Sequence, residues 1–217
     1  MSDLSALISR VRLTLGDPDG KRFSDALLTT AVRQALEQID QRLPRSLISD
    51  VTVIAGGREQ PLSGLTGCLF LVRLVYPVAS DGTLEMEPET QFSYVMRDGV
   101  PTIHFYGDVF PQTGEVIQVH YAARNTIEGL DAALSTTLPE VCEFALVNGA
   151  AGFACALRAG SLVEAYGARP AESAQLLETS RHWMELFNHG LDGLKVLQEF
   201  GFPPGFALDG WDRGVNR

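Results

Sequence analysis

Cysteine is scarce in this sequence, and no pattern of cysteine chemistry is present. The three cysteines are Cys68, Cys142 and Cys155. They form no C-x-x-C pair and leave an odd thiol, which argues against a disulfide framework and favours a reduced, intracellular protein. As small apolar residues they need no role beyond packing. The G-x-S-x-G pattern of a serine nucleophile is also missing, so the sequence offers no foothold for covalent catalysis.

Histidine is also rare, and its spacing does not predict a metal site. The four histidines are His104, His120, His182 and His189. Zinc-binding histidines commonly occur in H-x3-H or H-E-x-x-H spacing, which none of these residues has. We therefore interpret the histidines as structural and expect no metal and no cofactor.

Basic residues are outnumbered by acidic ones, 17 to 27, which gives a net charge of −10. Affinity for nucleic acid depends largely on lysine and arginine displacing counterions from phosphates. A surface built to grip DNA is therefore not expected.

Long apolar runs are missing as well. The first residues, MSDLSALISR, lack a basic leader followed by an apolar stretch, and no segment reaches the roughly 18 consecutive apolar residues that span a bilayer. We expect no contact with a membrane. The expected location is the cytoplasm, unless the protein leaves it within a particle.

Core-forming residues are present in ordinary amounts. Hydrophobic residues make up 45% of the 217 residues and charged residues 20%. Such a chain buries about 70% of its unfolded surface and needs no disulfide or metal to fold. A packed globular core is expected.

Apolar residues at helical spacing predict four helices. The first follows a Ser2/Asp3 cap and ends at Gly16, and the second follows a Ser24 cap and ends at Pro44. The third extends from Pro139 to Gly160, and the fourth from Pro170 towards Phe200.

The third predicted helix is unusually rich in small side chains. They are Ala145, Gly149, Ala150, Ala151, Gly152, Ala154 and Ala156. Each glycine costs roughly 1 kcal/mol of helix propensity relative to alanine. Close contact with another helix backbone would offset this loss.

Between Val51 and Arg124 the pattern changes to short β-branched and aromatic runs broken by Gly, Asp and Pro. This predicts a small antiparallel sheet joined by glycine-containing turns. The fold class is therefore α+β, with a four-helix core, an inserted small antiparallel β domain and an extended C-terminal tail. We expect the helical core over residues 1–48 and 126–199, the β domain over 49–125 and the tail over 200–217.

The segment GDPDGKRFSD concentrates acids, glycine and base at residues 16–25. Asp17, Asp19 and Gly20 resemble the start of a calcium loop, but Lys21 stands where a ligand is needed and no closing glutamate follows. The glycine spacing and preceding strand of a phosphate loop are also missing. We favour a structural interpretation, in which Asp-Pro ends one helix, Asp-Gly forms a turn and Ser24 begins the next helix.

Three acids alternate along one side of a predicted strand: Glu85, Glu87 and Glu89. As an acid/base pair they would need a pocket and one desolvated carboxyl group. As a solvated acidic face they need neither, and we favour this second interpretation.

The C-terminal stretch FGFPPGFALDGWDRGVNR is broken by prolines and glycines but is rich in aromatic residues. Its aromatics are Phe200, Phe202, Phe206 and Trp211. Apolar groups outside a core usually mark interfaces, although they could pack back on their own domain.

The segment LISRVRLTLGDPDGKRFSDALLTTAVRQALEQI resembles the N-terminal helical hairpin of head-to-tail adaptor (connector) proteins of tailed bacteriophages. Many members of that family contain V-R-x-x-L-x-D, a short turn, and then R-[FW]-S-D and a helix. The residues that match this motif are Asp17, Arg22, Phe23, Ser24 and Asp25. The resemblance is strong over residues 4–43 and architectural over the rest.

The resemblance implies a structural virion protein without catalytic residues. It implies a homo-oligomeric ring, usually of twelve copies, that docks on the portal protein and receives the tail or a neck protein. DNA would pass through its channel without specific binding, and Glu85, Glu87 and Glu89 could supply an acidic lumen or surface. The expected docking residues are Phe200, Phe202, Phe206 and Trp211.

Two other functions remain open from the sequence. One is a small cytoplasmic binding module or enzyme with a pocket between helices and sheet, around Tyr94, His104 and Tyr106. The other is a different neck or tail-completion protein, which would share the ring and differ in its neighbour.

Overall fold

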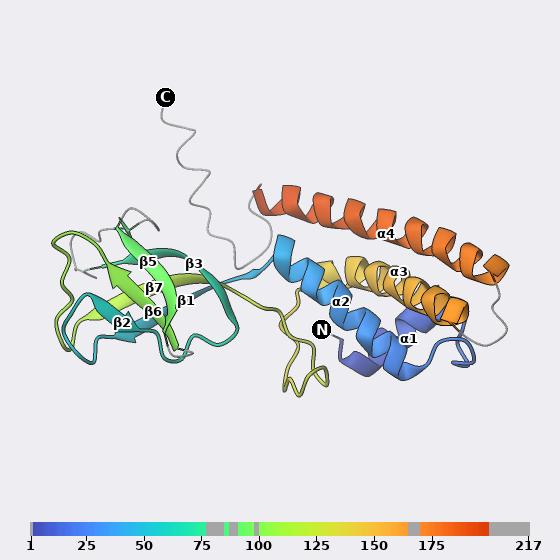
Figure 1. Cartoon of the computed structure of the whole chain (residues 1–217), viewed down its shortest axis with the longest axis horizontal. Coiled ribbons are helices and arrows are strands. Elements are labelled where there is room, and N and C mark those ends of the chain that lie inside the picture. Colours follow the sequence, from blue (N-terminus) through green and yellow to red (C-terminus); the bar gives the residue numbers. More distant parts are fainter. Residues whose placement is uncertain (1, 77–84, 87–90, 98–99, 165–169, 200–217) are drawn as a thin grey trace, which may run out of the picture. The chain divides into compact units, whose positions relative to one another are not determined.

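The computed structural model describes residues 2–76, 85–86, 91–97, 100–164 and 170–199. The chain forms two compact units, one comprising Met1–Leu43 with Asn125–Arg217 and the other Pro44–Arg124. The first unit is helical and the second contains the strands (Figure 1). The predicted α+β class with a four-helix core is confirmed.

The four helices of the first unit are α1 (Leu4–Thr14), α2 (Asp25–Arg42), α3 (Glu140–Glu164) and α4 (Pro170–Glu199). Asp3 caps α1 by accepting a hydrogen bond from the Ala6 N–H at 2.8 Å, and Ser24 caps α2 by accepting one from the Leu27 N–H at 3.3 Å. Each cap satisfies an N–H group that has no partner inside the helix.

The third helix is longer at its end than predicted. It passes Gly160 and continues to Glu164. A glycine costs a helix only about 1 kcal/mol, and Leu162 packs against the core beyond it. The packing of Leu162 therefore outweighs the cost of Gly160, and the helix continues past the glycine.

Helix α3 forms the centre of the helical unit, with α1, α2 and α4 packed against it (Figure 1). A Cβ atom on Gly149 would lie 2.9 Å from the Phe187 ring and 3.1 Å from the Ala35 Cβ atom. A Cβ atom on Gly152 would lie 2.8 Å from the Met184 sulfur. The small residues of α3 thus admit side chains of both α2 and α4.

Helix α3 is long and apolar enough to cross a membrane by length and composition. However, 67% of its apolar window is buried inside the protein, as in the core helix of a soluble protein. Its hydrophobicity is explained by its central position.

In its described residues, the second unit contains seven strands in two antiparallel sheets, where one sheet was predicted. The strands are β1 (Arg45–Thr52), β2 (Glu59–Pro61), β3 (Cys68–Val75), β4 (Glu85–Met86), β5 (Phe92–Arg97), β6 (Val100–Phe105) and β7 (Val116–Ala123). The sheet orders are β1-β7-β3-β4 and β2-β6-β5. The single-sheet prediction was wrong. Apolar residues from both sheets form one shared core, including Leu74, Phe92, Ile103 and Val119. The apolar pattern of a strand therefore does not indicate to which sheet it belongs.

The first strand begins at Arg45, six residues before the predicted start at Val51. Its early residues include Ser46, Ser49 and Asp50, so the apolar signal of a strand is weak there. The strand is nevertheless fixed by continuous pairing with β7, from Arg45 opposite Ala123 to Thr52 opposite Val116.

Hydrogen bonds join the point at which the chain leaves the helical unit to the point at which it returns. The buried Asp40 carboxylate accepts hydrogen bonds from the Asn125 backbone N–H at 2.8 Å and from its side-chain amide at 2.7 Å. The same amide donates to the Leu43 carbonyl at 3.5 Å. The end of α2 is thereby tied to the returning chain.

We predict that Gly149→Ala lowers the free energy of unfolding by about 1 kcal/mol. Overpacking costs roughly 1 to 3 kcal/mol, against a gain in helix propensity of about 1 kcal/mol. Urea denaturation followed by the helical circular dichroism signal measures the change. Gly160→Ala is the matched control, because its new Cβ atom would meet nothing within 4 Å. We expect it to be neutral or stabilising, and equal effects at both positions would contradict the close-packing account.

Candidate functional site

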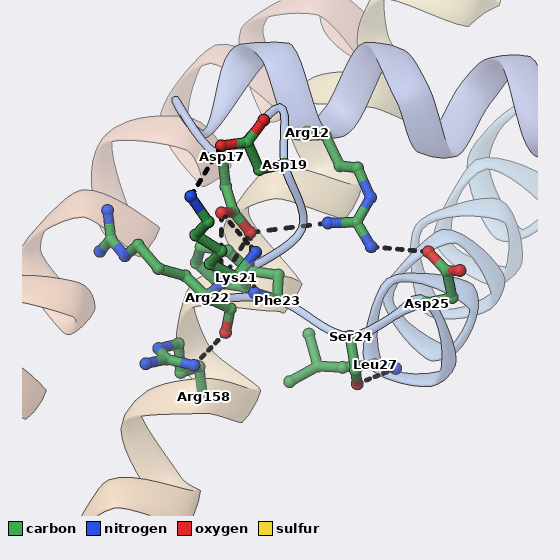
Figure 2. A network of polar contacts seen from close by, with 10 residues as sticks. All are labelled: Arg12, Asp17, Asp19, Lys21, Arg22, Phe23, Ser24, Asp25, Leu27 and Arg158. Atoms are coloured by element: carbon green, nitrogen blue, oxygen red, sulfur yellow. Dashed lines mark hydrogen bonds and ion pairs between the residues drawn. The ribbon is translucent and has the colours of Figure 1, made fainter.

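The turn between α1 and α2 is organised around the Asp17 side chain, which is only 4% exposed. Its carboxylate accepts hydrogen bonds from three consecutive backbone N–H groups, those of Lys21 at 2.9 Å, Arg22 at 3.0 Å and Phe23 at 2.9 Å. Figure 2 shows these bonds converging on one side chain. The turn therefore has a single internal anchor.

Arg12 connects this anchor to the next helix. Its guanidinium lies 3.6 Å from the Asp17 carboxylate and 2.6 Å from that of Asp25, in the first turn of α2 (Figure 2). Gly20 has a φ of +67°, and a Cβ atom there would lie 2.4 Å from the Arg12 guanidinium. The left-handed backbone favours glycine here, and a side chain at this position would displace the Arg12 guanidinium.

The pKa of Asp17 reflects opposing effects. Burial raises the pKa of the carboxyl group, but the N–H groups of Phe23, Arg22 and Lys21 and the charge of Arg12 lower it. The balance lies below the ordinary value of 3.8. The carboxylate is therefore ionised and satisfied by donors from its own turn.

Phe23 fixes the turn against α3. Its side chain is 1% exposed, and its ring lies 5.6 Å from the Arg22 guanidinium and 5.5 Å from that of Arg158. Arg158, on α3, also donates a hydrogen bond to the Arg22 carbonyl and lies 3.8 Å from the Glu172 carboxylate of α4. The turn is consequently bound to both long helices.

A cavity of about 220 Å³ lies beside this turn. It is lined by Thr14, Leu15, Arg22, Phe23, Cys155, Glu172, Gln175, Leu176, Thr179 and Trp183. Burial raises the pKa of the Cys155 thiol to about 11, which disfavours the nucleophilic thiolate. The lining can receive a group by packing and hydrogen bonding, but it presents no activated nucleophile.

The polar groups of the turn hold its backbone in place. Among the residues that the structure describes, no group of three histidine, cysteine, aspartate or glutamate side chains could hold a metal ion. The oxygens of Asp17 are directed at backbone donors, so the calcium-loop interpretation has no ligand set to support it.

The other predicted site residues lie elsewhere or outside the described residues. Glu85 lies in β4, opposite Val75, whereas Glu87 and Glu89 belong to segments that the structure does not describe. The aromatic residues predicted for docking, Phe200, Phe202, Phe206 and Trp211, also lie outside the described residues.

The residues suggested for an alternative pocket belong to the β2-β6-β5 sheet and the segment after it. The His104 and Tyr106 rings lie 5.6 Å apart, and Tyr94 pairs with Ile103 across β5 and β6. The cavity described above belongs instead to the helical unit.

Sequence reasoning did not assign Arg12 or Arg158 to the site. Arg12 could have been found, because it precedes Asp17 by five residues within the quoted V-R-x-x-L-x-D motif. Arg158 is distant in sequence from the turn, so only the folded chain brings it there.

The chain belongs to the SU10 adaptor protein family, whose pattern matches residues 2–203. The resemblance to adaptor proteins is thereby confirmed. No curated protein matches the chain.

Chains in several solved structures are similar to this one, among them three from gene transfer agent particles. One from the neck of an empty gene transfer agent (GTA) particle, computed with C6 symmetry, is 22% identical with a TM-score of 0.29 and covers 80% of this chain and 87% of that chain. One from the virion of a native GTA particle is 21% identical with a TM-score of 0.28, covering 81% and 86%. One from the neck of a native GTA particle, computed with C12 symmetry, is 17% identical with a TM-score of 0.29, covering 83% and 91%.

We predict that Asp17→Asn lowers the free energy of unfolding at pH 7 by about 1.5 to 3 kcal/mol, the range for hydrogen bonds to a charged group. Because the folded-state pKa of Asp17 is below 3.8, its stabilisation is present above about pH 4 and is lost as the pH falls through the folded value. The difference between wild type and variant should therefore shrink in acid. Urea denaturation at pH 7 and at pH 3 measures it.

The matched control is Asp19→Asn in the same turn. Asp19 is exposed and contacts the flexible Lys21 amine at 3.0 Å, an interaction worth at most about 1 kcal/mol. A loss at Asp19 equal to that at Asp17 would show that the buried network does not hold the turn.

Proposed function

We propose that this protein is a structural head-to-tail adaptor of a virion, forming a ring that joins the portal to the tail or the next neck protein. The observation that carries this proposal is the match to the SU10 adaptor protein family over residues 2–203. The ring contains twelve copies and leaves a channel for DNA. The protein acts in the particle neck after assembly in the host cytoplasm.

The physical character of the chain supports a structural function. The buried Asp17 carboxylate of the α1–α2 turn is directed at internal donors, and burial raises the pKa of the Cys142 and Cys155 thiols to about 11. The polar groups of this turn thus hold the helices together. The role is assembly and not catalysis.

The net charge of −10 suits a channel protein through which DNA must slide. We assign Glu85, Glu87 and Glu89 to an acidic face towards the channel. Phe200, Phe202, Phe206 and Trp211 form the docking tail that contacts the portal.

Removal of residues 201–217 should abolish docking and spare the fold, because this segment carries three of the four docking aromatics. Electron microscopy of the truncated chain mixed with portal rings measures docking, and circular dichroism checks the fold. The full-length chain is the control. Binding of the truncated chain at full-length affinity would refute the docking role of the tail.

Reversal of Glu85, Glu87 and Glu89 to lysine should leave rings intact and impair genome passage, because a basic face attracts DNA. Particle counts by microscopy report assembly, and infectivity or DNA transfer reports passage. Reversal of the exposed acids Glu178 and Glu185 of α4 provides a control of equal sign. Unchanged genome passage in the first variant would show that these acids do not face the channel.

A further inference from the structure

We propose that residues 200–208 pack on Val141 and Phe144 at the start of α3 of the same chain, and that they leave this surface when the tail docks. The first half of this inference concerns the free subunit and needs no ring. The second half rests on the proposed function. Together they give the tail two alternative surfaces, one on its own subunit and one on its docking partner.

The start of α3 exposes two large apolar side chains. Phe144 is 66% exposed and Val141 is 48% exposed, whereas Ala145, next to Phe144, is buried in the core. Residues three apart lie on one face of a helix, so the two side chains are neighbours. Apolar side chains that lie together on a surface mark interaction sites more often than isolated ones do. Val141 and Phe144 are called the α3 patch below.

The outward direction of the α3 patch is fixed by the residue beside it. The buried Glu143 carboxylate accepts hydrogen bonds from the Ser2 backbone N–H at 2.8 Å and from the Ser2 hydroxyl at 2.9 Å, and it pairs with Arg10. These contacts hold one face of the helix start against the N-terminal segment. The α3 patch, on another face, therefore stays exposed in the described residues.

The packing of α3 against α4 brings the end of α4 to the α3 patch. A Cβ atom on Gly152 would lie 2.8 Å from the Met184 sulfur, and one on Gly190 would lie 3.4 Å from the Ala145 Cβ atom. The contacts move back along α3 as α4 advances, so the two helices are antiparallel (Figure 1). The start of α3 and the end of α4 consequently lie at the same end of the helical unit.

The tail begins close enough to reach the α3 patch. From Gly190 to Glu199, α4 advances by nine residues, which is about 14 Å. Phe144 lies one residue before Ala145, so the end of α4 passes it by about 12 Å along the axis. Packed helix axes are about 8 to 10 Å apart. The seven residues from Glu199 to Phe206 can span about 24 Å, so Phe206 can lie on the patch.

Residues 200–208 lie outside the described residues, but their sequence, FGFPPGFAL, suits an apolar surface. It contains three phenylalanines and no charged residue. Its two prolines have no backbone N–H group, so burial of this segment leaves fewer donors in need of a partner. Charged residues return at Asp209. The uncharged part of the tail is thus the part that can reach the α3 patch.

The small size of the α3 patch favours a tethered segment over a second copy. Two exposed side chains fall far short of the roughly 1,000 Å² that a specific interface between separate proteins buries. A segment joined to the same subunit by a few residues has an effective concentration in the millimolar range. A weak contact of this size is therefore formed within one chain.

Cross-linking of the full-length chain tests the contact. Cys68→Ser removes the half-buried thiol, and Glu140→Cys and Ala207→Cys place new thiols beside Phe144 and Phe206. Oxidation should join the two new thiols within one chain. Addition of Phe144→Ser should slow this reaction at least about tenfold, because the burial of a phenylalanine side chain is lost. Mass spectrometry of mixed labelled and unlabelled chains separates links within a chain from links between chains.

The matched control combines Glu178→Cys with Ala207→Cys. Glu178 is exposed on α4 but lies 21 residues before its end, about 32 Å along the axis. The eight residues from Glu199 to Ala207 span at most about 29 Å. No link should therefore form within one chain. For the pair at Glu140 and Ala207, links between chains only, or a rate that Phe144→Ser leaves unchanged, would overturn the inference.

Proteolysis gives a second measurement. Chymotrypsin cleaves after aromatic residues, and packing on the α3 patch should protect Phe206. Phe144→Ser should raise the cleavage rate there at least about tenfold, whereas Leu177→Ser, which removes another exposed apolar side chain, should not. Equal cleavage of wild type and Phe144→Ser would contradict the packing of the tail. Circular dichroism checks that each variant is folded.

Docking separates this inference from the proposed function. The oxidised chain with Glu140→Cys and Ala207→Cys should not bind portal rings, and reduction should restore binding. Equal binding of both forms would overturn the release of the tail on docking. If wild type does not bind portal rings although the link and the protection are found, the docking function fails and the contact in the free subunit stands. If wild type binds but neither link nor protection is found, the inference fails and the docking function stands.

Discussion

The arrangement of the helical unit depends on the hydrogen bonds that the Asp17 carboxylate accepts. Three consecutive N–H groups turn inward at residues 21–23, and unpaired buried N–H groups are costly. By accepting all three, one aspartate fixes the path that places Phe23 in the core and Ser24 at the N-cap of α2. Arg12 then couples this aspartate to Asp25. Through the Phe23 ring and the Arg22 carbonyl, the same turn engages Arg158 and therefore α3.

The small side chains of α3 provide the second constraint. Gly149 and Gly152 lose helix propensity but allow Phe187, Ala35 and Met184 to lie against the helix at near-backbone distance. This arrangement buries α3 between α2 and α4 without large cavities at those positions. Helix α3 is therefore held on two sides by close packing.

The sequence predicted those parts of the fold that depend on local signals. Ser24, Pro44 and Pro170 mark helix boundaries because caps and prolines act on their immediate neighbours. The division into two sheets was missed because it depends on which strands pair, and β2 finds its partner β6 about forty residues away. In the site, Asp17 and Phe23 could be placed from their motif. Arg158 could not, because its approach to the turn follows from how α3 packs and not from any nearby residue.

Rigidity of this kind matters for the ring that we propose. Each copy in a closed ring must present two different surfaces at a fixed angle, because a deviation at one contact is repeated at every contact around the ring. A flexible turn between α1 and α2 would let these two helices shift against α3. The Asp17–Arg12 and Glu143–Arg10 pairs oppose such a shift by holding the second half of α1, one against the turn and the other against α3. In the ring that we propose, such contacts would keep the surfaces of each copy in register.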